Sequence, residues 1–200
     1  MSRELELARE LVKKLEEVEK ANKVQLSELQ PGETFKIGEH DFIVLEQNGC
    51  SGTTNVISKS FMAEDVVFDS DTRDYNKSNL KRVIEKNIQP VIEAGVGAGN
   101  IIEQAVVLTS VDMQNKFKPC YCKARPITFD EARKYNNLLA NNDLDDWWAC
   151  TPWSTADRGW KYAITVVSPS GNFHRYDCFG NCGVRPFCIL KSNIFVSKGE

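Results

Sequence analysis

Two adjacent tryptophans, Trp147 and Trp148, and the alternating segments that follow them constrain the fold more than any other feature of the sequence. Residues 161–168 (KYAITVVS) and 172–178 (NFHRYDC) flank the tight turn PSG and predict a β-hairpin. The apolar segment 183–190 (GVRPFCIL) predicts a further strand. One tryptophan should anchor a core, because its large ring buries much apolar area. Its neighbour should lie nearer the surface, since adjacent residues of an extended segment face opposite ways.

The rest of the chain predicts short, local strands with helices between them, which indicates an α+β fold rather than alternating βαβ units. Ser78 and Thr128 are placed to cap helices, and Thr128 forms a capping box with Glu131. The glycine-rich stretch 95–100 (GVGAGN) is interpreted as a flexible turn, because a helix precedes it and a strand-like segment follows, the reverse of a phosphate loop. The predicted elements are a helix over 3–22, a hairpin over 34–47, a strand over 53–61, a helix over 75–95 that Pro90 kinks or ends, and a helix over 128–140.

The N-terminal helix is amphipathic, and four of its residues follow the spacing of a coiled-coil seam. A helix this short is marginal in water on its own, so its apolar stripe needs a partner. That partner is the same domain, a second copy of the chain, or another protein. We interpret residues 1–24 as an assembly or anchoring segment. The seam residues are Ala8, Leu11, Leu15 and Val18.

Composition limits the classes of function. The net charge of −3 gives no electrostatic reason to expect nucleic-acid binding. No apolar run approaches the roughly 18 residues of a membrane span. The charged start MSRELELARELVKK lacks the apolar region of a secretory signal. Seven cysteines, an odd number, favour free and mostly buried thiols in a chain that matures in a reducing cytosol.

The order of these parts resembles a domain-of-unknown-function family found in bacterial surface proteins and phage proteins. In that family a Trp-Trp pair, a Pro-containing loop, a Gly turn and a Gly-Val-Arg-Pro segment follow one another. The resemblance implies a C-type lectin-like domain over residues 31–195, in the version shared with formylglycine-generating enzymes and retroelement variable proteins. The sequence departs from the family pattern at Ala149-Cys150 and at Phe187-Cys188. The residues that it implies to be structural are Trp147, Trp148, Gly183, Arg185 and Pro186.

The resemblance also implies a ligand-binding face between the Trp pair and the Gly-Val-Arg-Pro segment, the zone that displays ligand-binding residues in retroelement variable proteins. Aromatic rings and short polar side chains together suit protein or glycan recognition, because rings supply area and amides adapt. The plain alternative is that these residues merely complete a surface. The candidates are Thr151, Trp153, Ser154, Arg158, Trp160, Asn172, His174, Tyr176, Phe179 and Asn181.

The sequence supports a metal site or a catalytic site less strongly than it supports a binding face. Asp143, Asp145 and Asp146 offer carboxylates that suit a hard cation, although such a run is more often a solvated loop. The cysteine pairs 120/122 and 178/182 lack the spacing of a redox or zinc motif, and buried cysteines commonly act as small apolar residues. His40 and His174 are far apart in sequence and complete no catalytic arrangement. The sequence therefore predicts a protein that is not an enzyme and that needs no metal and no cofactor.

The resulting prediction is a binding or display module of a phage virion, of the head-fibre or decoration type, assembled in the host cytoplasm. Its ligand is expected to be a protein or a glycan, with no nucleic acid and no membrane span. The N-terminal helix should mediate homo-oligomerisation or attachment to a carrier virion protein. Two alternatives remain open. One is a cytoplasmic phage factor that binds and blocks a host protein, and the other is a cysteine- or metal-dependent enzyme related to formylglycine-generating enzymes.

Overall fold

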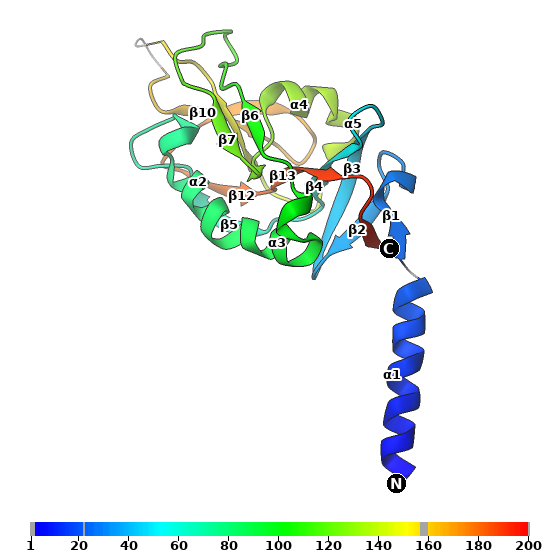
Figure 1. The fold of residues 1–200 in the computed structure, drawn as a ribbon. Helices are drawn as coiled ribbons and strands as arrows, with labels where there is room; N and C mark the ends of the chain where they lie inside the picture. The colour runs from blue at the N-terminus through cyan, green and yellow to red at the C-terminus, as the bar shows by residue number, and fades with distance from the viewer. Residues whose placement is uncertain (1–2, 22, 157–159, 200) are drawn as a thin grey trace.

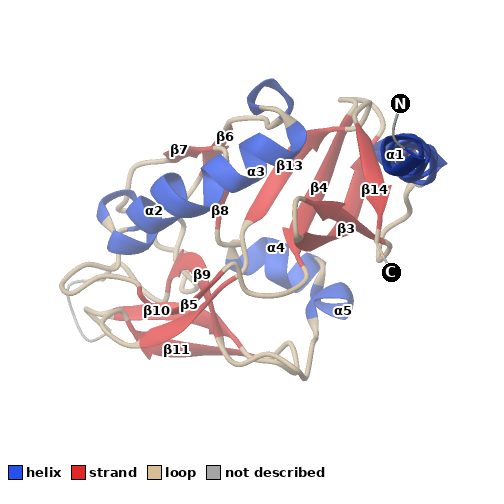
Figure 2. Cartoon of the chain, turned by 90° about the horizontal axis from the view of Figure 1, so that it is seen from below, coloured by secondary structure: helices blue, strands red, loops and turns tan. Residues whose placement is uncertain are grey.

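Two large, mainly antiparallel sheets form the centre of the molecule, in a computed structural model that describes residues 3–21, 23–156 and 160–199 (Figure 1). A two-stranded ribbon and several short helices complete the described part of the chain. The predicted α+β class is confirmed, because every strand pair is antiparallel apart from the short contact between β9 and β12. Helices pack on both faces of the sheets, so each sheet separates two apolar layers (Figure 2).

The seven-stranded sheet contains the predicted N-terminal hairpin. Phe35 of β2 is paired with Phe42 of β3, and both rings are buried. Gly38 makes the tight turn between them with a φ of 59°, a left-handed conformation that glycine adopts without strain. In sheet order the strands are β1 (Lys23–Gln25), β14 (Phe195–Lys198), β2 (Thr34–Ile37), β3 (His40–Asn48), β4 (Thr53–Ser58), β13 (Phe187–Lys191) and β8 (Ala124–Arg125).

The five-stranded sheet carries the tryptophan pair, and both tryptophans are fully buried. The expectation that one lies nearer the surface is wrong, because the two faces of β9 are each covered by a core. Trp148 packs edge-on against Phe68, with 5.7 Å between the ring centres. Trp147 packs on the opposite side with Phe187. In sheet order the strands are β11 (Phe173–Asp177), β10 (Ala163–Val167), β9 (Trp147–Pro152), β12 (Asn181–Val184) and β5 (Ala63–Val67).

The predicted strand over 183–190 is two strands that belong to different sheets. β12 ends at Val184 and β13 begins at Phe187, so only Arg185 and Pro186 cross between the sheets. Proline has no N–H for a sheet ladder, which explains the break at this position. Arg185 is buried at the crossing, where Nε donates to the Ser58 carbonyl and Nη1 to the Leu139 carbonyl, both at 2.9 Å. The structural roles expected for Arg185 and Pro186 therefore have a physical basis.

The predicted helix over 75–95 is continuous from residue 79 to residue 96 and changes its winding along that stretch, whereas residues 75–77 form a separate 3-10 turn before Ser78. Ser78 caps it as predicted, with its hydroxyl accepting from the Lys81 N–H at 3.1 Å. Pro90 neither ends nor interrupts the helix, because a π-helical turn precedes it and widens the ladder where proline offers no N–H. The segments are η2 (Tyr75–Lys77), α2 (Asn79–Val83), the π turn η3 (Ile84–Ile88), α3 (Gln89–Val96) and η4 (Ala98–Asn100), the last within the predicted glycine-rich turn.

The predicted helix over 128–140 forms two short helices on the other face of the sheets. α4 (Phe129–Lys134) starts with the predicted capping box of Thr128 and Glu131, which is confirmed. α5 (Asn136–Leu139) follows after Tyr135. Figure 2 shows α4 between the two large sheets, where its buried Ala132 joins the core around Trp147. β6 (Gln104–Val106) lies in the strand-like segment expected after the glycine-rich turn, whereas β7 (Cys120–Cys122) and its pairing with β6 were not predicted.

The N-terminal helix α1 (Arg3–Ala21) matches the predicted range and extends away from the sheets (Figure 1). Its apolar residues Leu5, Leu7, Leu11 and Val12 are exposed. The globular part starts before the expected boundary at residue 31, because β1 pairs with β14 and is followed directly by η1 (Leu26–Glu28). Over the ranges that the structure describes, no helix has the length and apolar character needed to cross a membrane.

We expect Trp147→Ala to lower the free energy of unfolding by about 3–5 kcal/mol, because it opens a cavity between the sheets. Arg185→Ala should cost a similar amount, since two buried carbonyls lose their donor at about 1–3 kcal/mol each. Urea unfolding followed by circular dichroism measures both. The control is Trp160→Ala, an exposed tryptophan whose removal should cost about 1 kcal/mol or less. Equal losses at positions 147 and 160 would contradict this assignment.

Candidate functional site

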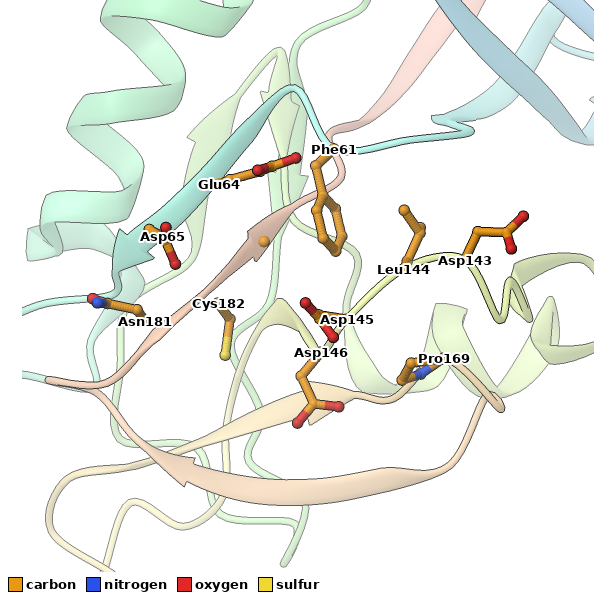
Figure 3. Close-up of a pocket in the computed structure, with 11 residues that line it drawn as sticks. Phe61, Glu64, Asp65, Asp143, Leu144, Asp145, Asp146, Pro169, Asn181 and Cys182 are labelled. Atoms are coloured by element: carbon orange, nitrogen blue, oxygen red, sulfur yellow. The ribbon is translucent and has the colours of Figure 1, made fainter.

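A cavity of about 610 Å³ opens between the edge of the five-stranded sheet and the loop that precedes β9. One wall is formed by β5 and the start of β12, and the facing wall by the loop 143–146 (Figure 3). The lining residues are Phe61, Glu64, Asp65, Asp143, Leu144, Asp145, Asp146, Pro169, Asn181, Cys182 and Gly183.

The loop wall is fixed by backbone hydrogen bonds at both of its ends. The Asn141 N–H donates to the Pro169 carbonyl at 2.9 Å, and the Asn141 side chain accepts from the Asp143 N–H at 3.1 Å. At the far end, the Gly183 N–H donates to the Asp146 carbonyl at 3.0 Å. These bonds hold the acidic loop beside β12, so its carboxylates line a formed cavity rather than a free turn.

The opposite wall depends on a close contact between a ring and a glycine. A Cβ at position 183 would lie 2.4 Å from Cζ of Phe61, so only glycine leaves room for this ring. The Met62 N–H donates to the Val184 carbonyl at 2.9 Å, which starts the pairing of β5 with β12. Gly183 therefore has a structural role, because its missing side chain leaves room for the Phe61 ring in the wall of the cavity.

Charge is the dominant chemical property of the cavity. Five of its residues carry carboxylates, and none of the described residues that line it is lysine or arginine. Figure 3 shows that the carboxylates come from both walls: Asp145 of the loop points toward Glu64 and Asp65 on β5, whereas the Asp143 side chain points away from β5. Clustered negative charges attract cations and raise their local concentration. The acidic residues on the loop are Asp143, Asp145 and Asp146.

Two residues of the predicted binding face lie at this cavity. Asn181 lines it directly. His174, on the edge strand β11, brings Nε2 within 2.9 Å of the Asp146 carboxylate. Both side chains of that pair are only partly exposed. The predicted face and the acidic loop, which are separate features in the sequence, therefore meet at Asp146.

Thr151 and Ser154 do not belong to a binding face, because both are buried. Thr151 lies on β9, which is buried along its whole length, and its hydroxyl accepts from the Phe129 N–H at 2.9 Å at the start of α4. The Ser154 hydroxyl accepts from the Ala156 N–H at 3.1 Å. These two predictions were wrong because both hydroxyls accept hydrogen bonds from backbone N–H groups inside the fold.

Three aromatic residues of the predicted face are exposed, and each contacts a neighbouring side chain. The Arg175 guanidinium stacks 3.7 Å from the centre of the Trp160 ring. Phe179 contacts Tyr162 at 5.9 Å, and Tyr176 covers Trp148 at 6.0 Å between ring centres. Of the remaining candidates, Asn172 is exposed, Trp153 is half-buried, and Arg158 lies outside the described residues.

The β5 wall of the site was not predicted from the sequence. Phe61, Glu64 and Asp65 meet the loop 143–146 only because β5 pairs with β12, which is distant in the sequence. No local pattern marks these residues as partners of the loop. The acidic run itself was the available signal, and it was interpreted as a solvated turn or a cation site.

The cysteines and histidines are dispersed through the fold. Six of the seven cysteines are buried, as predicted, and all seven are free thiols. Cys178 and Cys182 flank the turn from β11 to β12, whereas Cys120 and Cys122 belong to the β6–β7 ribbon. Within the described ranges, no three His, Cys, Asp or Glu side chains converge as the ligands of a metal ion.

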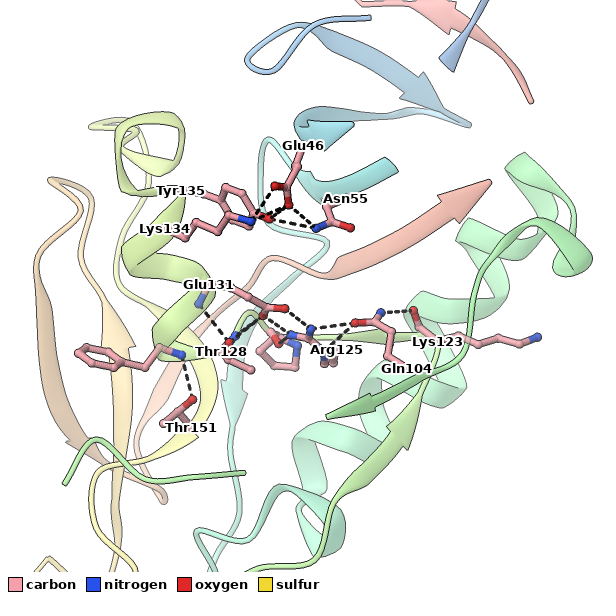
Figure 4. A network of polar contacts seen from close by, with 12 residues as sticks. Glu46, Asn55, Gln104, Lys123, Arg125, Thr128, Glu131, Lys134, Tyr135 and Thr151 are labelled. Atoms are coloured by element: carbon pink, nitrogen blue, oxygen red, sulfur yellow. Dashed lines mark hydrogen bonds and ion pairs between the residues drawn. The ribbon is translucent and has the colours of Figure 1, made fainter. Parts of the chain in front are cut away.

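A buried ion pair between Arg125 and Glu131 lies outside the acidic cavity (Figure 4). The Arg125 guanidinium donates to both Glu131 oxygens, at 2.6 and 2.7 Å, and to the Gln104 side chain at 2.8 and 3.2 Å. Burial alone raises the pKa of Glu131, but Arg125 and the hydrogen bonds from Thr128 outweigh it and lower that pKa. Because the acceptors and donors are mutually satisfied, we assign this network to stability.

A smaller polar cluster ties α4 to the seven-stranded sheet. The Lys134 ammonium donates to both carboxylate oxygens of Glu46 at 2.7 Å, and the Tyr135 hydroxyl donates to the same carboxylate at 2.5 Å. Lys134 and Tyr135 together lower the pKa of Glu46. This cluster also positions a helix and lines none of the acidic cavity.

Comparisons with known proteins give no relative for this chain: no family model matches it, and neither a curated protein nor a solved structure is similar to it. The function must therefore be argued from the site itself.

We predict that Glu131→Gln lowers the free energy of unfolding at neutral pH. The variant should also lose less of that free energy than the wild type when the pH is lowered. The pKa of Glu131 is lowered in the folded state. Its carboxylate therefore stabilises the fold above the unfolded pKa of about 4.3, and this contribution is lost as pH falls through the folded pKa. Urea unfolding at about pH 7 and about pH 3 measures the effect. Asp130→Asn, at an exposed neighbour, is the control. An unchanged acid slope in Glu131→Gln would refute the assignment.

Proposed function

We propose that the chain is a non-enzymatic binding module whose acidic cavity receives a positively charged group of its ligand. The observation that carries this proposal is the concentration of five carboxylates around one cavity of about 610 Å³ without a lining lysine or arginine among the described residues. In the free protein these carboxylates repel one another, and a bound cation relieves the repulsion.

The shape of the site favours an organic cation on a larger partner. The carboxylates stand on two facing walls (Figure 3), so they suit several separated positive charges, such as lysine and arginine side chains of a protein segment. Phe61, Leu144 and Pro169 add apolar surface for the aliphatic stems of those side chains. The partner class that fits best is therefore a protein with a basic segment, which refines the expected protein or glycan ligand.

The edge strand β11 extends the proposed contact area beyond the cavity. His174 touches Asp146, and two positions further along the same strand Tyr176 presents an exposed ring. Alternate residues of a strand share a face, so these two side chains stand side by side. A rigid ring beside an acidic cavity suits a protein partner, because aromatic residues supply contact area at low entropic cost.

We propose a C-type lectin-like arrangement for the globular part, on the strength of the sequence resemblance. The Trp-Trp and Gly-Val-Arg-Pro segments that carry it are neighbours in space, since Gly183 is paired with Trp147 between β12 and β9. The family occurs in phages, which supports a virion-associated protein of the head-fibre or decoration type. In this proposal the cavity faces the ligand and α1 attaches the module to its assembly.

The exposed stripe of α1 supports its role as an assembly helix. Leu5, Leu7, Leu11 and Val12 are exposed on a helix that extends away from the sheets (Figure 1). Burying each of these side chains against a partner contributes about 1.5–3 kcal/mol. Ala8 and Leu11 of the predicted seam are exposed, and the side chains of Leu15 and Val18 lie outside the described part of the structure. A second copy or a carrier protein is the proposed partner.

The proposed function predicts that an oligolysine peptide binds the chain and that the loop aspartates carry the binding. We expect the triple variant Asp143→Asn, Asp145→Asn and Asp146→Asn to weaken binding about tenfold, because each solvent-facing ion pair contributes about 0.2–1 kcal/mol. Isothermal titration calorimetry at low and at physiological salt measures the affinity. Salt should weaken the wild-type complex more than the variant complex.

The matched control removes the same charge elsewhere on the surface. Glu28→Gln, Glu39→Gln and Asp130→Asn replace three exposed carboxylates that do not line the cavity. This variant should bind the peptide with wild-type affinity. If both triple variants lose affinity equally, net charge rather than the cavity explains the binding, and the proposed site is wrong.

A chain that starts at residue 22 should fold as a monomer, whereas the full chain should sediment as an oligomer or be recovered on purified particles with its carrier. The physical reason is that the truncation removes the exposed stripe of α1 and keeps β1 and its pairing with β14. Analytical ultracentrifugation and thermal melting provide the measurements. A monomeric full chain, absent from particles, together with a truncation that aggregates, would place the helix in the domain's own core.

A further inference from the structure

The five-stranded sheet ends in an open edge strand. β11 is its outermost strand, with β10 on the inner side and, in the described part of the chain, no strand on the outer side (Figure 2). The Cys178 N–H donates to the Tyr162 carbonyl at 2.8 Å, and the Ser168 N–H donates to the Asn172 carbonyl at 2.9 Å. In this register the even-numbered residues of β11 bond to β10. The backbone groups that point to the open edge are therefore those of residues 173, 175 and 177.

The outward backbone groups of β11 are available for pairing with another strand. The N–H groups of Arg175 and Asp177 have no hydrogen-bond partner among the described residues. The Asp177 carbonyl accepts from the Gly180 N–H at 2.9 Å, and the Arg175 carbonyl lies 3.3 Å from Nδ1 of His174. Each of these carbonyl oxygens has a second lone pair. An added strand can therefore bond to β11 along its outer edge.

Two opposite charges stand on this edge. Arg175 and Asp177 are both exposed, and neither forms an ion pair with a described residue. Their side chains leave the same face of β11, because alternate residues of a strand share a face. The flat face of the Arg175 guanidinium stacks on the Trp160 ring at 3.7 Å, and stacking leaves the N–H groups at its rim free for a carboxylate.

We propose that β11 pairs with β11 of a second copy of this chain, in antiparallel orientation about a two-fold axis at Tyr176. In this register Arg175 of each copy lies opposite Asp177 of the other, so two cross-strand ion pairs form. The same two residues exchange backbone hydrogen bonds, because both point to the open edge. The two Tyr176 side chains meet at the axis as an aromatic pair, and the two sheets become one continuous sheet.

Charge selects this register over its neighbours. An axis at Arg175 places the two arginines opposite each other, and like charges directly opposite destabilise a sheet. An axis at His174 places Arg175 opposite Phe173, and Asp177 then lies opposite Gly171, beyond the start of β11. Only the axis at Tyr176 gives both charged side chains an opposite partner. A basic peptide strand satisfies Asp177 but repels Arg175, so a second copy fits this edge better.

This pairing goes beyond the proposed function and does not depend on the acidic cavity. No residue of β11 lines that cavity. The protein that meets the exposed Tyr176 ring is, in this inference, a second copy of the chain. α1 belongs to neither large sheet, and copies that it holds together present their β11 strands to each other at a raised effective concentration.

Cross-linking tests the pairing in the full-length chain with Cys50→Ser, which removes the exposed cysteine. Opposite residues at the axis form a non-hydrogen-bonded pair with Cα atoms about 4.5 Å apart, a distance that a disulfide spans. Tyr176→Cys in this background should give a covalent dimer on mild oxidation, and dithiothreitol should reverse it. Tyr121→Cys is the matched control, since Tyr121 is a more exposed tyrosine on β7, and it should stay monomeric on a denaturing gel.

A charge swap in the Tyr176→Cys background tests the register. Asp177→Arg sets arginine against arginine on both sides of the axis and should lower the dimer yield about fivefold. Adding Arg175→Asp restores opposite charges and should restore the yield. The pairing is overturned if Tyr176→Cys and Tyr121→Cys give equal amounts of dimer, if the single swap leaves the yield unchanged, or if the double swap fails to recover it.

Hydrogen exchange tests the same pairing with β11 intact. In the chain with Cys50→Ser alone, the amide of Arg175 should exchange more slowly than in the same chain with Asp177→Arg, because the pairing bonds this outward N–H. The amide of Val166, on the central strand β10, is the control and should exchange at the same rate in both proteins. Equally fast exchange at Arg175 in both proteins overturns the proposal, whatever the cross-linking variants do.

Discussion

The burial of one arginine holds the two large sheets together. Arg185 sits where the chain crosses from β12 to β13, with its guanidinium 4.8 Å from the centre of the Trp147 ring. Taking this charge out of water costs several kcal/mol, and burial lowers its pKa to about 10. The carbonyls of Ser58 and Leu139 offset the cost, and they belong to β4 and to the end of α5. One side chain therefore fixes both sheets and a helix relative to each other.

This crossing also determines where the cavity forms. Gly183 and Val184 precede Arg185 directly, so the position of the arginine sets the position of β12. β12 in turn brings β5 on one side and β9 on the other. The acidic loop ends where β9 begins, and its Asp146 carbonyl accepts from Gly183. Stability and the proposed binding site thus depend on the same short segment, residues 183–185.

Local signals in the sequence predicted local structure well. The capping box at Thr128, the cap at Ser78 and the hairpin that pairs Phe35 with Phe42 involve neighbours in the sequence, and all are confirmed. Features that depend on distant segments were missed or wrong. The burial of Trp148 requires Phe68, and the cavity requires β5 beside the loop 143–146. The hydrophobic periodicity of a segment does not identify the distant segment that it packs against, because strand pairing at long range leaves no local pattern.

The pairing of β1 with β14 has a topological consequence. Lys23 lies opposite Ser197, so the two ends of the globular part leave it at one place. A short linker can join such ends, and new termini can then be opened at the exposed turn between β3 and β4, around residues 49–52. The same adjacency lets the globular part be inserted as a unit into a surface loop of another protein. Its fold does not require that it stand at the end of a chain.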